Sequence, residues 1–407
     1  MLRVFQDAAV SLRGCKKIVC VLQDYLPSFR NAPAASTLQS WLLRLGLHEL
    51  LRPKERADDW IWIVDHTIQL GSMKCLLIVG VRRSAWEISD RPITLHDLTM
   101  ISLEPVETSN GDVVCQQLHA AAEKNGSPRA ILSDQGSDLK RGIALFRGDD
   151  FDTLALHDIA HQTALALKEA LADDPRWDAF VKQCGQVQPR VKQTELGCLA
   201  PPKLKVKGRY MNLSRLMNWG VNMAASVETP PANRYANMDL TRLDEKFDWI
   251  REYHSALDDW SHLDAVKECV LTYIRRHGYH RQAARELCQQ LKTIACTPAS
   301  LRMAASLVLF VKQQSRELDA GEHLPGSSEV IESLIGKGKR MQGQHSRNGF
   351  TRMILGMAAS VVNLSNEKIC LALETIRDLD LAEWLTEHLG ITLTTQRRAV
   401  LSGTKTG

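Results

Sequence analysis

The sequence predicts an α/β protein with a mixed sheet, a large all-α insertion and a small helical region at its N-terminus. Short apolar runs alternate with amphipathic stretches between residues 60 and 172, whereas the patterns from about 173 to 325 are almost all helical. The predicted segments are a helical region at 1–55, a first part of the α/β domain at 56–172, the insertion at 173–325, a helix followed by C-terminal helices at 326–395, and a disordered tail at 396–407.

Composition supports a globular protein and excludes several other classes. The chain has 407 residues, of which 44% are apolar and 24% are charged, with a net charge of +4. Its ten cysteines include no CxxC pair, so we expect free thiols in a reducing cytoplasm rather than a zinc site. No apolar run approaches the roughly 20 residues of a membrane span, so we expect no membrane association. The small positive charge permits nucleic-acid binding without arguing for it.

Two short helical patterns come first. Residues 8–26 and 34–46 have apolar side chains at helical spacing, and the sequence "PSFRNAP" separates them. Two helices joined by such a turn suggest a DNA-binding helix-turn-helix within region 1–55. The alternative is a small helical packing unit.

The region that follows predicts the sheet. Segments 60–70 and 73–83 flank a Gly-Ser turn and indicate a β-hairpin, and 93–107 indicates a third strand. A helix at 111–126, a strand at 129–136, a helix at 137–147, a strand at 151–162 and a helix at 163–174 come next. Antiparallel strands followed by alternating units predict a mixed sheet.

Two aspartates stand out on these strands. Asp65 lies within the first apolar strand, and Asp134 ends a later one. In a sheet of this order the two strands can be neighbours, which would bring the carboxylates together at one edge. Two close carboxylates cannot both stay ionised without a cation. Mg²⁺ takes one or two protein carboxylates plus phosphate oxygens, so the pair predicts a magnesium site.

A third carboxylate is expected from the helix that starts near residue 329. Glu332 and Lys339 are seven residues apart (339 − 332 = 7), about two helical turns, so they share one face. This places a carboxylate for a metal and a cation for a DNA phosphate together. Glu329 has only Gly336 at the same offset.

These residues resemble the DDE transposases of bacterial insertion sequences, which have an RNase H-like catalytic core. The resemblance rests on Asp65 in "WIVDHTI", Asp134 in "ILSDQG" and Glu332 in "VIESLIGKGKR", and it covers about residues 60–340. The gap from Asp134 to Glu332 is long (332 − 134 = 198) and resembles members with a helical insertion, and "LALHDIAHQTALAL" resembles the segment before the insertion in hAT-like elements. Ser328 stands where some subgroups have an arginine, so the match to those subgroups is partial.

The resemblance implies a mechanism and partners. Asp65, Asp134 and Glu332 would bind two Mg²⁺ (or Mn²⁺) ions, water would cleave the phosphodiester at the transposon ends, and the freed 3′-hydroxyl would attack target DNA. Phosphates would be held by Lys337, Lys339 and Arg340, and His66 would orient a nucleophile. The expected partners are the terminal repeats, target DNA and further copies of the chain in a homodimer or larger assembly. The expected location is the bacterial cytoplasm, at the nucleoid.

Several alternatives stay open from the residues themselves. Asp158 follows a strand as Asp134 does, so Asp158 and Glu329 are the alternative acidic ligands. His157 and His161 have a spacing that suits a metal on a helix, but without an evident third ligand we expect packing or DNA contact. The tryptophans of the insertion are expected in its core. The alternative functions are a catalytically inactive DNA-binding derivative of a transposase, or an RNase H-like nuclease or resolvase without strand transfer.

Overall fold

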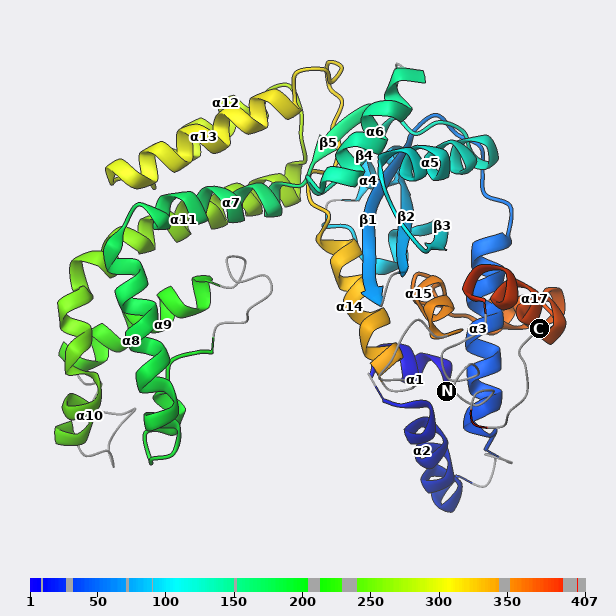
Figure 1. Ribbon diagram of the computed structural model, residues 1–407, viewed down its shortest axis with the longest axis horizontal. Helices are drawn as coiled ribbons and strands as arrows, with labels where there is room; N and C mark the ends of the chain where they lie inside the picture. Colours follow the sequence, from blue (N-terminus) through cyan, green and yellow to red (C-terminus); the bar gives the residue numbers. More distant parts are fainter. Residues whose placement is uncertain are drawn as a thin grey trace. The chain divides into compact units, whose positions relative to one another are not determined.

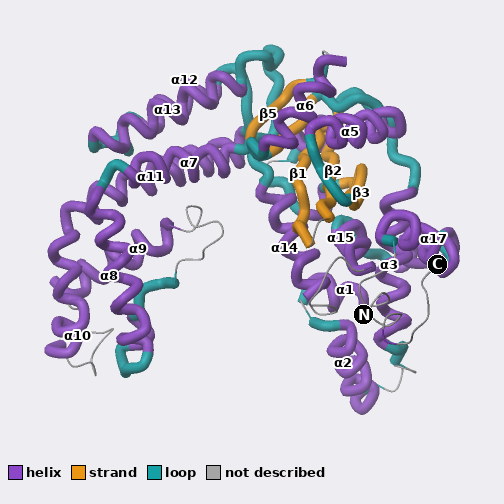
Figure 2. Tube along the Cα trace, viewed as in Figure 1, coloured by secondary structure: helices purple, strands orange, loops and turns teal. Residues whose placement is uncertain are grey.

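The computed structural model divides the chain into two compact units. Unit 1 contains Met1–Leu156 and Ser328–Gly407, and unit 2 contains His157–Ser327. The residues that the structure describes are 1–8, 10–26, 32–70, 73–89, 91–149, 152–203, 213–228, 240–343, 352–390 and 401. Figure 2 shows the strands gathered in unit 1, whereas unit 2 is built from helices.

A five-stranded mixed sheet forms the centre of unit 1, as the sequence predicts. The strands are β1 (Trp60–Leu70), β2 (Met73–Arg82), β3 (Thr99–Val106), β4 (Ala130–Ser133) and β5 (Leu154–His157), in the order β3-β2-β1-β4-β5. The chain leaves unit 1 at the last of these strands, whose final residue begins unit 2. β1 pairs antiparallel with β2 and parallel with β4, and β2 pairs antiparallel with β3. The predicted hairpin and the succession of five strands are therefore confirmed. The strand predicted at 151–162 is shorter, because a helix begins at Ile159, and a short unpredicted helix follows β2.

Helices of unit 1 pack on both faces of this sheet (Figure 1). Five of those that contact the strands are α3 (Ala35–Leu51), α4 (Arg83–Ile88), α5 (Gly111–Asn125), α14 (Glu329–Gly343) and α17 (Asp378–Leu389). The helix after β4 is α6 (Ser137–Asp149), which contacts β4 and packs on α5. The remaining ones are α1 (Leu2–Asp7), α2 (Leu12–Tyr25), α15 (Leu355–Ser360) and α16 (Asn366–Thr375).

Alternation along β1 divides its side chains between the two faces. Trp62 and Val64 join a buried cluster with side chains of α5 and α6, such as Val114. Ile61 and Ile63 are also fully buried but point to the opposite face, because successive residues of a strand alternate. A strand buried on both faces requires a helix layer on each side, which is the arrangement in unit 1.

The N-terminal helices are arranged differently from the predicted helix-turn-helix. α3 contacts β3, α15, α16 and α17, and its leucines at 38, 42, 43, 45 and 47 are all buried. A recognition helix needs an exposed face for the DNA groove, whereas α3 is largely enclosed in the core of unit 1. The structure favours the alternative, a helical packing unit. Most of the predicted turn, residues 27–31, lies outside the described residues.

The C-terminal region has more helices than the two that periodicity predicts. α15, α16 and α17 follow one another, and all six residues of α15 are buried. A short helix buried on every side has no polar face, so its sequence has no helical periodicity to detect. The tail predicted at 396–407 lies outside the described residues, except for Leu401.

Unit 2 is built from α7 to α13. The helices are α7 (Ile159–Ala172), α8 (Pro175–Lys192), α9 (Leu213–Glu228), α10 (Leu240–Phe247), α11 (His254–His277), α12 (Ala283–Leu291) and α13 (Pro298–Gln314). The sequence predicts that the insertion begins at 173, whereas α7 belongs to unit 2 by its contacts. Helix α7 packs against α11 and α13 of the same unit, which explains this assignment.

Aromatic side chains form the centre of unit 2, as the sequence predicts for its tryptophans. Phe180 is fully buried, and its ring lies 5.2 Å from those of Trp260 and Tyr253. Trp177 meets Trp260 edge-to-face at 4.9 Å, and Trp260 donates its indole N–H to Asp174 at 3.0 Å. Such rings contribute large buried areas, and the buried indole has the hydrogen-bond partner it needs.

Two further expectations concern thiols and membranes. All ten cysteines are free thiols, as predicted. Within the described residues, no helix has both the length and the apolar character needed to cross a membrane.

A glycine sets the distance between α3 and α15. A Cβ atom at Gly46 would lie 2.0 Å from the backbone oxygen of Leu355. We therefore predict that Gly46→Ala lowers the free energy of unfolding by more than about 2 kcal/mol, because the two helices would have to separate. Chemical denaturation followed by circular dichroism measures the change.

Gly148→Ala is the matched control for this prediction. Gly148 lies near the end of α6, and nothing surrounds its Cβ position within 4 Å. This variant should keep or raise stability by up to about 1 kcal/mol, because alanine is the better helix former. Equal stability of the two variants would contradict the close approach of α3 and α15.

Candidate catalytic site

Asp65 and Asp134 each follow one residue of the last pair between two neighbouring parallel strands. The register of β1 and β4 pairs Val64 with Ser133; Asp65 is the next residue on β1, and Asp134 is the first residue after β4. Neighbouring strands lie about 4.8 Å apart, and residues at equivalent positions point to the same face. The structure thus brings together the two aspartates that the sequence selects.

The turn after β4 holds the second carboxylate. The backbone N–H of Gly136 donates to Oδ1 of Asp134 at 3.0 Å, and α6 begins at the next residue, Ser137. An aspartate that accepts from the backbone two residues later forms an Asx turn. The turn fixes the carboxylate of Asp134 at the end of the strand.

Helix α14 brings the third predicted carboxylate to the same region. It contacts β1, and Glu332 lies exposed in its first turn, within electrostatic range of Asp65. Further along, Gly338 leaves room for the side chain of Met357 of α15, which packs α14 closely against that helix. Two carboxylates that are far from Asp65 in the sequence, Asp134 and Glu332, therefore act on it in unit 1.

The surroundings of Asp65 favour its protonated form. Burial raises the pKa of its carboxyl most, and the neighbouring charges of Asp134 and Glu332 raise it further, to about 7. The backbone N–H of His66 and the cation of Lys339 act in the opposite direction. A carboxyl group held among other carboxylates in this way is a site where a cation would relieve repulsion.

The donor set fits a hard divalent cation. Among the described residues, no three His, Cys, Asp or Glu side chains already stand close enough together to hold a metal ion. Mg²⁺ needs only one or two protein carboxylates, because water and substrate phosphates complete its shell. The pair of Asp65 and Asp134 meets that requirement, and Glu332 would have to turn toward the pair to join it.

His66 points away from this pair. It is the residue after Asp65 on β1, so alternation directs its ring to the face that carries α5 and α6. Its Nε2 lies 2.8 Å from the hydroxyl of Ser109, just before α5. Burial lowers the pKa of His66, as does Lys74, while Asp138 and Asp134 act against this shift. This placement does not fit the expected role of orienting a nucleophile at Asp65.

The three cations predicted on α14 have different environments. Lys339 and Arg340 are exposed, and Lys339 is within electrostatic range of Asp65. Lys337 is only 9% exposed, and burial lowers the pKa of its amine, partly offset by Asp7. A buried Lys337 does not fit the expected contact with a phosphate, whereas the other two are accessible for one.

The alternative acidic residues have other structural positions. Asp158 is 2% exposed and caps α7, accepting from the backbone N–H groups of Ala160 and His161 at 3.1 Å each. It belongs to unit 2. The sequence contains a signal for this capping role, because an aspartate directly before an apolar helical pattern is a preferred N-cap. Glu329 is the first residue of α14 and is partly buried.

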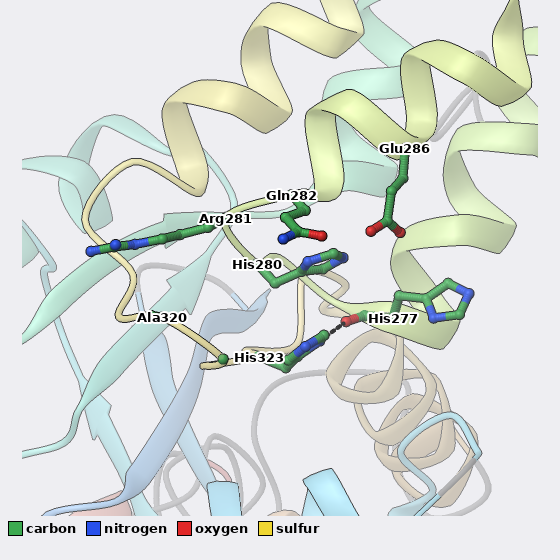
Figure 3. A pocket seen from close by; sticks show the side chains of 8 residues that line it. His277, His280, Arg281, Gln282, Glu286, Ala320 and His323 are labelled. Carbon is green, nitrogen blue, oxygen red and sulfur yellow. Dashed lines mark hydrogen bonds between the residues drawn. The ribbon is translucent and has the colours of Figure 1, made fainter.

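A hollow in unit 2 is not predicted by the sequence. It has a volume of about 340 Å³ and is lined by His277, His280, Arg281, Gln282, Glu286, Ala320, Gly321 and His323 (Figure 3). The rings of His280 and His323 stack at 4.4 Å, and Tyr273 bridges His280 and Glu286 at 2.9 and 2.8 Å. No local motif marks these residues, because they come from two segments of the chain, 277–286 and 320–323.

Comparisons with known proteins identify no family for the chain. No protein-family model matches it, and no curated protein matches it. Among solved structures, it is similar to a chain of the Drosophila P element transposase strand transfer complex, with a TM-score of 0.41 and 11% identity. The similarity covers 90% of this chain and 96% of that one.

The pKa of Asp65 leads to a prediction about stability. Asp65 binds its proton more tightly in the folded chain than in the unfolded chain, so folding is favoured at low pH. Without metal, the unfolding free energy should therefore fall as pH rises from about 4 through 7. At pH 8 we predict that Asp65→Asn is more stable than the wild type by roughly 2–4 kcal/mol, because it removes the buried charge.

Denaturant titrations at pH 5 and pH 8 in the presence of EDTA test this prediction. The gain from Asp65→Asn should be much smaller at pH 5, where Asp65 is largely protonated. Glu329→Gln, which removes a carboxylate from the start of the same helix as Glu332, is the control and should show no such pH dependence. A variant Asp65→Asn that is less stable than the wild type at pH 8 would contradict the raised pKa.

Proposed function

We propose that the chain is a DDE-type transposase with an RNase H-like catalytic core, which cleaves DNA at transposon ends and joins them to target DNA. One observation carries this proposal. The parallel pairing of β1 and β4 sets Asp65 beside Asp134, and α14 brings Glu332 into electrostatic range of Asp65. Three acidic residues in this order, with the third after a helical insertion, match the family that the sequence resembles.

The carboxylates would supply the metal site. Asp65, Asp134 and Glu332 would hold two Mg²⁺ or Mn²⁺ ions. When bound, such ions lower the pKa of water and neutralise charge on the phosphoryl group, which is the chemistry that phosphodiester cleavage and transfer require. Strand β1 and the turn after β4 position the first two side chains, whereas Glu332 lies on a helix and would adjust its rotamer on binding.

The cations of α14 would position the DNA. Lys339 and Arg340 are exposed on the helix that carries Glu332. Arginine binds phosphate through two parallel N–H donors, and lysine acts as a point charge. Together they would hold the backbone so that one phosphodiester lies at the carboxylates. The proposed assembly is a homodimer or larger, because two transposon ends must be joined.

Cleavage and joining by the purified protein test the proposal. With Mg²⁺ and DNA that carries the repeats flanking the gene, we expect strand cleavage at the repeats followed by joining to a target plasmid. We predict that Asp65→Asn, Asp134→Asn and Glu332→Gln each reduce both steps by at least about 100-fold, since removing even a residue that only supports a metal ligand costs 10- to 100-fold. Gel separation of end-labelled DNA measures both steps.

Two conservative variants serve as controls. Asp158→Asn keeps a capping side chain, and Glu329→Gln leaves the three proposed ligands intact, so both should retain activity. If Glu332→Gln is fully active and one control variant is inactive, the residue substituted in that control is the third ligand instead of Glu332. Cleavage without joining would indicate a nuclease or resolvase, and binding without cleavage would indicate an inactive derivative.

A further inference from the structure

A basic hollow lies at the end of α13 in unit 2. It has a volume of about 540 Å³ and is lined by Arg281, Leu309, Lys312, Gln313, Ser315 and Arg316. Half of these side chains are cations, and none is acidic. The lysine comes from the last turn of α13, Arg316 follows that helix, and Arg281 precedes α12, so two separate segments place positive charge at one point.

Carboxylates neutralise some of the arginines of unit 2, but not the cations of this hollow. Arg176 pairs with Asp174 and Asp259, and Arg251 pairs with Asp244 and Asp248. In contrast, Arg281, Lys312 and Arg316 form no ion pair within the part of the chain that the structure describes.

One of the three cations is nevertheless held in place. Nε of Arg281 donates to the backbone oxygen of Leu318 at 2.6 Å, which anchors this guanidinium group without neutralising it. Glu317 follows Arg316 in the sequence but does not line the hollow. The positive charge of the hollow is therefore left for a ligand.

A buried hydroxyl group gives a second, independent indication of a ligand. Ser315 is only 4% exposed, and among the described residues its Oγ has no hydrogen-bond partner. A buried polar group without a partner costs free energy, so such groups usually have one. Ser315 lines the hollow together with the three cations, so an anionic ligand there would supply the acceptor that this hydroxyl lacks.

The neighbouring histidine hollow does not share this character. Arg281 borders both hollows, and Figure 3 shows its side chain extending away from His280 and Glu286. Glu286 gives the histidine hollow a carboxylate, and the hydroxyl of Tyr273 donates to it. An anion is therefore favoured in the basic hollow alone.

We propose that the basic hollow binds a backbone phosphate of DNA, so that unit 2 makes a DNA contact of its own. This inference rests on the proposed function, which supplies the DNA. Two guanidinium groups and one ammonium group match the oxygens of a phosphodiester, and all three are exposed. Contacts of this kind position a protein on DNA without reading its sequence.

Salt-dependent DNA binding by the full-length protein tests the inference. The triple variant Arg281→Gln/Lys312→Gln/Arg316→Gln should bind duplex DNA more weakly, whatever its sequence. The slope of log K against log salt concentration should decrease in magnitude by about 0.9 for each phosphate that the variant no longer neutralises. Fluorescence anisotropy at several salt concentrations measures both quantities.

Arg302→Gln is the matched control. Arg302 is exposed on the first turns of α13, outside the hollow, and its substitution removes the same charge. It should change the slope much less than Lys312→Gln does on the same helix. Circular dichroism and thermal unfolding establish that each variant remains folded, and unfolding is not expected because the substituted side chains are exposed.

A second measurement locates the bound DNA directly. Acetylation of lysines by a small reagent, followed by mass spectrometry, should show that DNA protects Lys312 in the wild-type protein.

An unchanged salt slope in the triple variant, or equal acetylation of Lys312 with and without DNA, would overturn the inference. If the wild type cleaves DNA and the triple variant binds DNA as tightly as the wild type does, this inference fails but the proposed function stands. If the wild type binds no DNA, the proposed function fails as well.

Discussion

The parallel pairing of β1 with β4 is the constraint on which the candidate site depends. It places Asp65, on β1, beside Asp134, the residue that follows β4, and the Asx turn with Gly136 fixes the second carboxylate there. Because Asp65 is buried and lies near the charges of Asp134 and Glu332, its ionised form is disfavoured and its pKa is raised to about 7. The buried strands and the helices on both faces stabilise an arrangement that is unfavourable by itself. Strain of this kind is typical of functional sites, where a ligand relieves it.

The two units differ in the charge of the groups that their candidate sites bring together. In unit 1 the candidate site gathers carboxylates, which suit a cation. In unit 2 the aromatic rings around Phe180 form the core, and the basic hollow gathers cations around Lys312. DNA is a polyanion that also brings phosphate oxygens to metals, so both kinds of site are consistent with one substrate. Unit 2 would then be more than a structural insertion between the acidic residues.

Most of the local structure could be predicted from the sequence. The hairpin of β1 and β2, the strand that ends before Asp134 and the helix of Glu332 all have clear periodicity or turn residues. The candidate pair was anticipated because, in a sheet with elements in this order, the strand before Asp134 can lie beside the first strand, which brings their ends together. The aromatic core of unit 2 was predictable for a simpler reason, since large rings are seldom left exposed.

The sequence by itself thus determined the elements, the mixed sheet and the acidic residues to compare, since these depend on local patterns. Only the tertiary structure decided which side chains are accessible. It buried Lys337, enclosed α3 in the core and made Asp158 a helix cap. It also gathered Arg281 with Lys312 and Arg316 from separate segments. Burial and charge pairing depend on neighbours that are distant in the chain, and no local pattern contains that information.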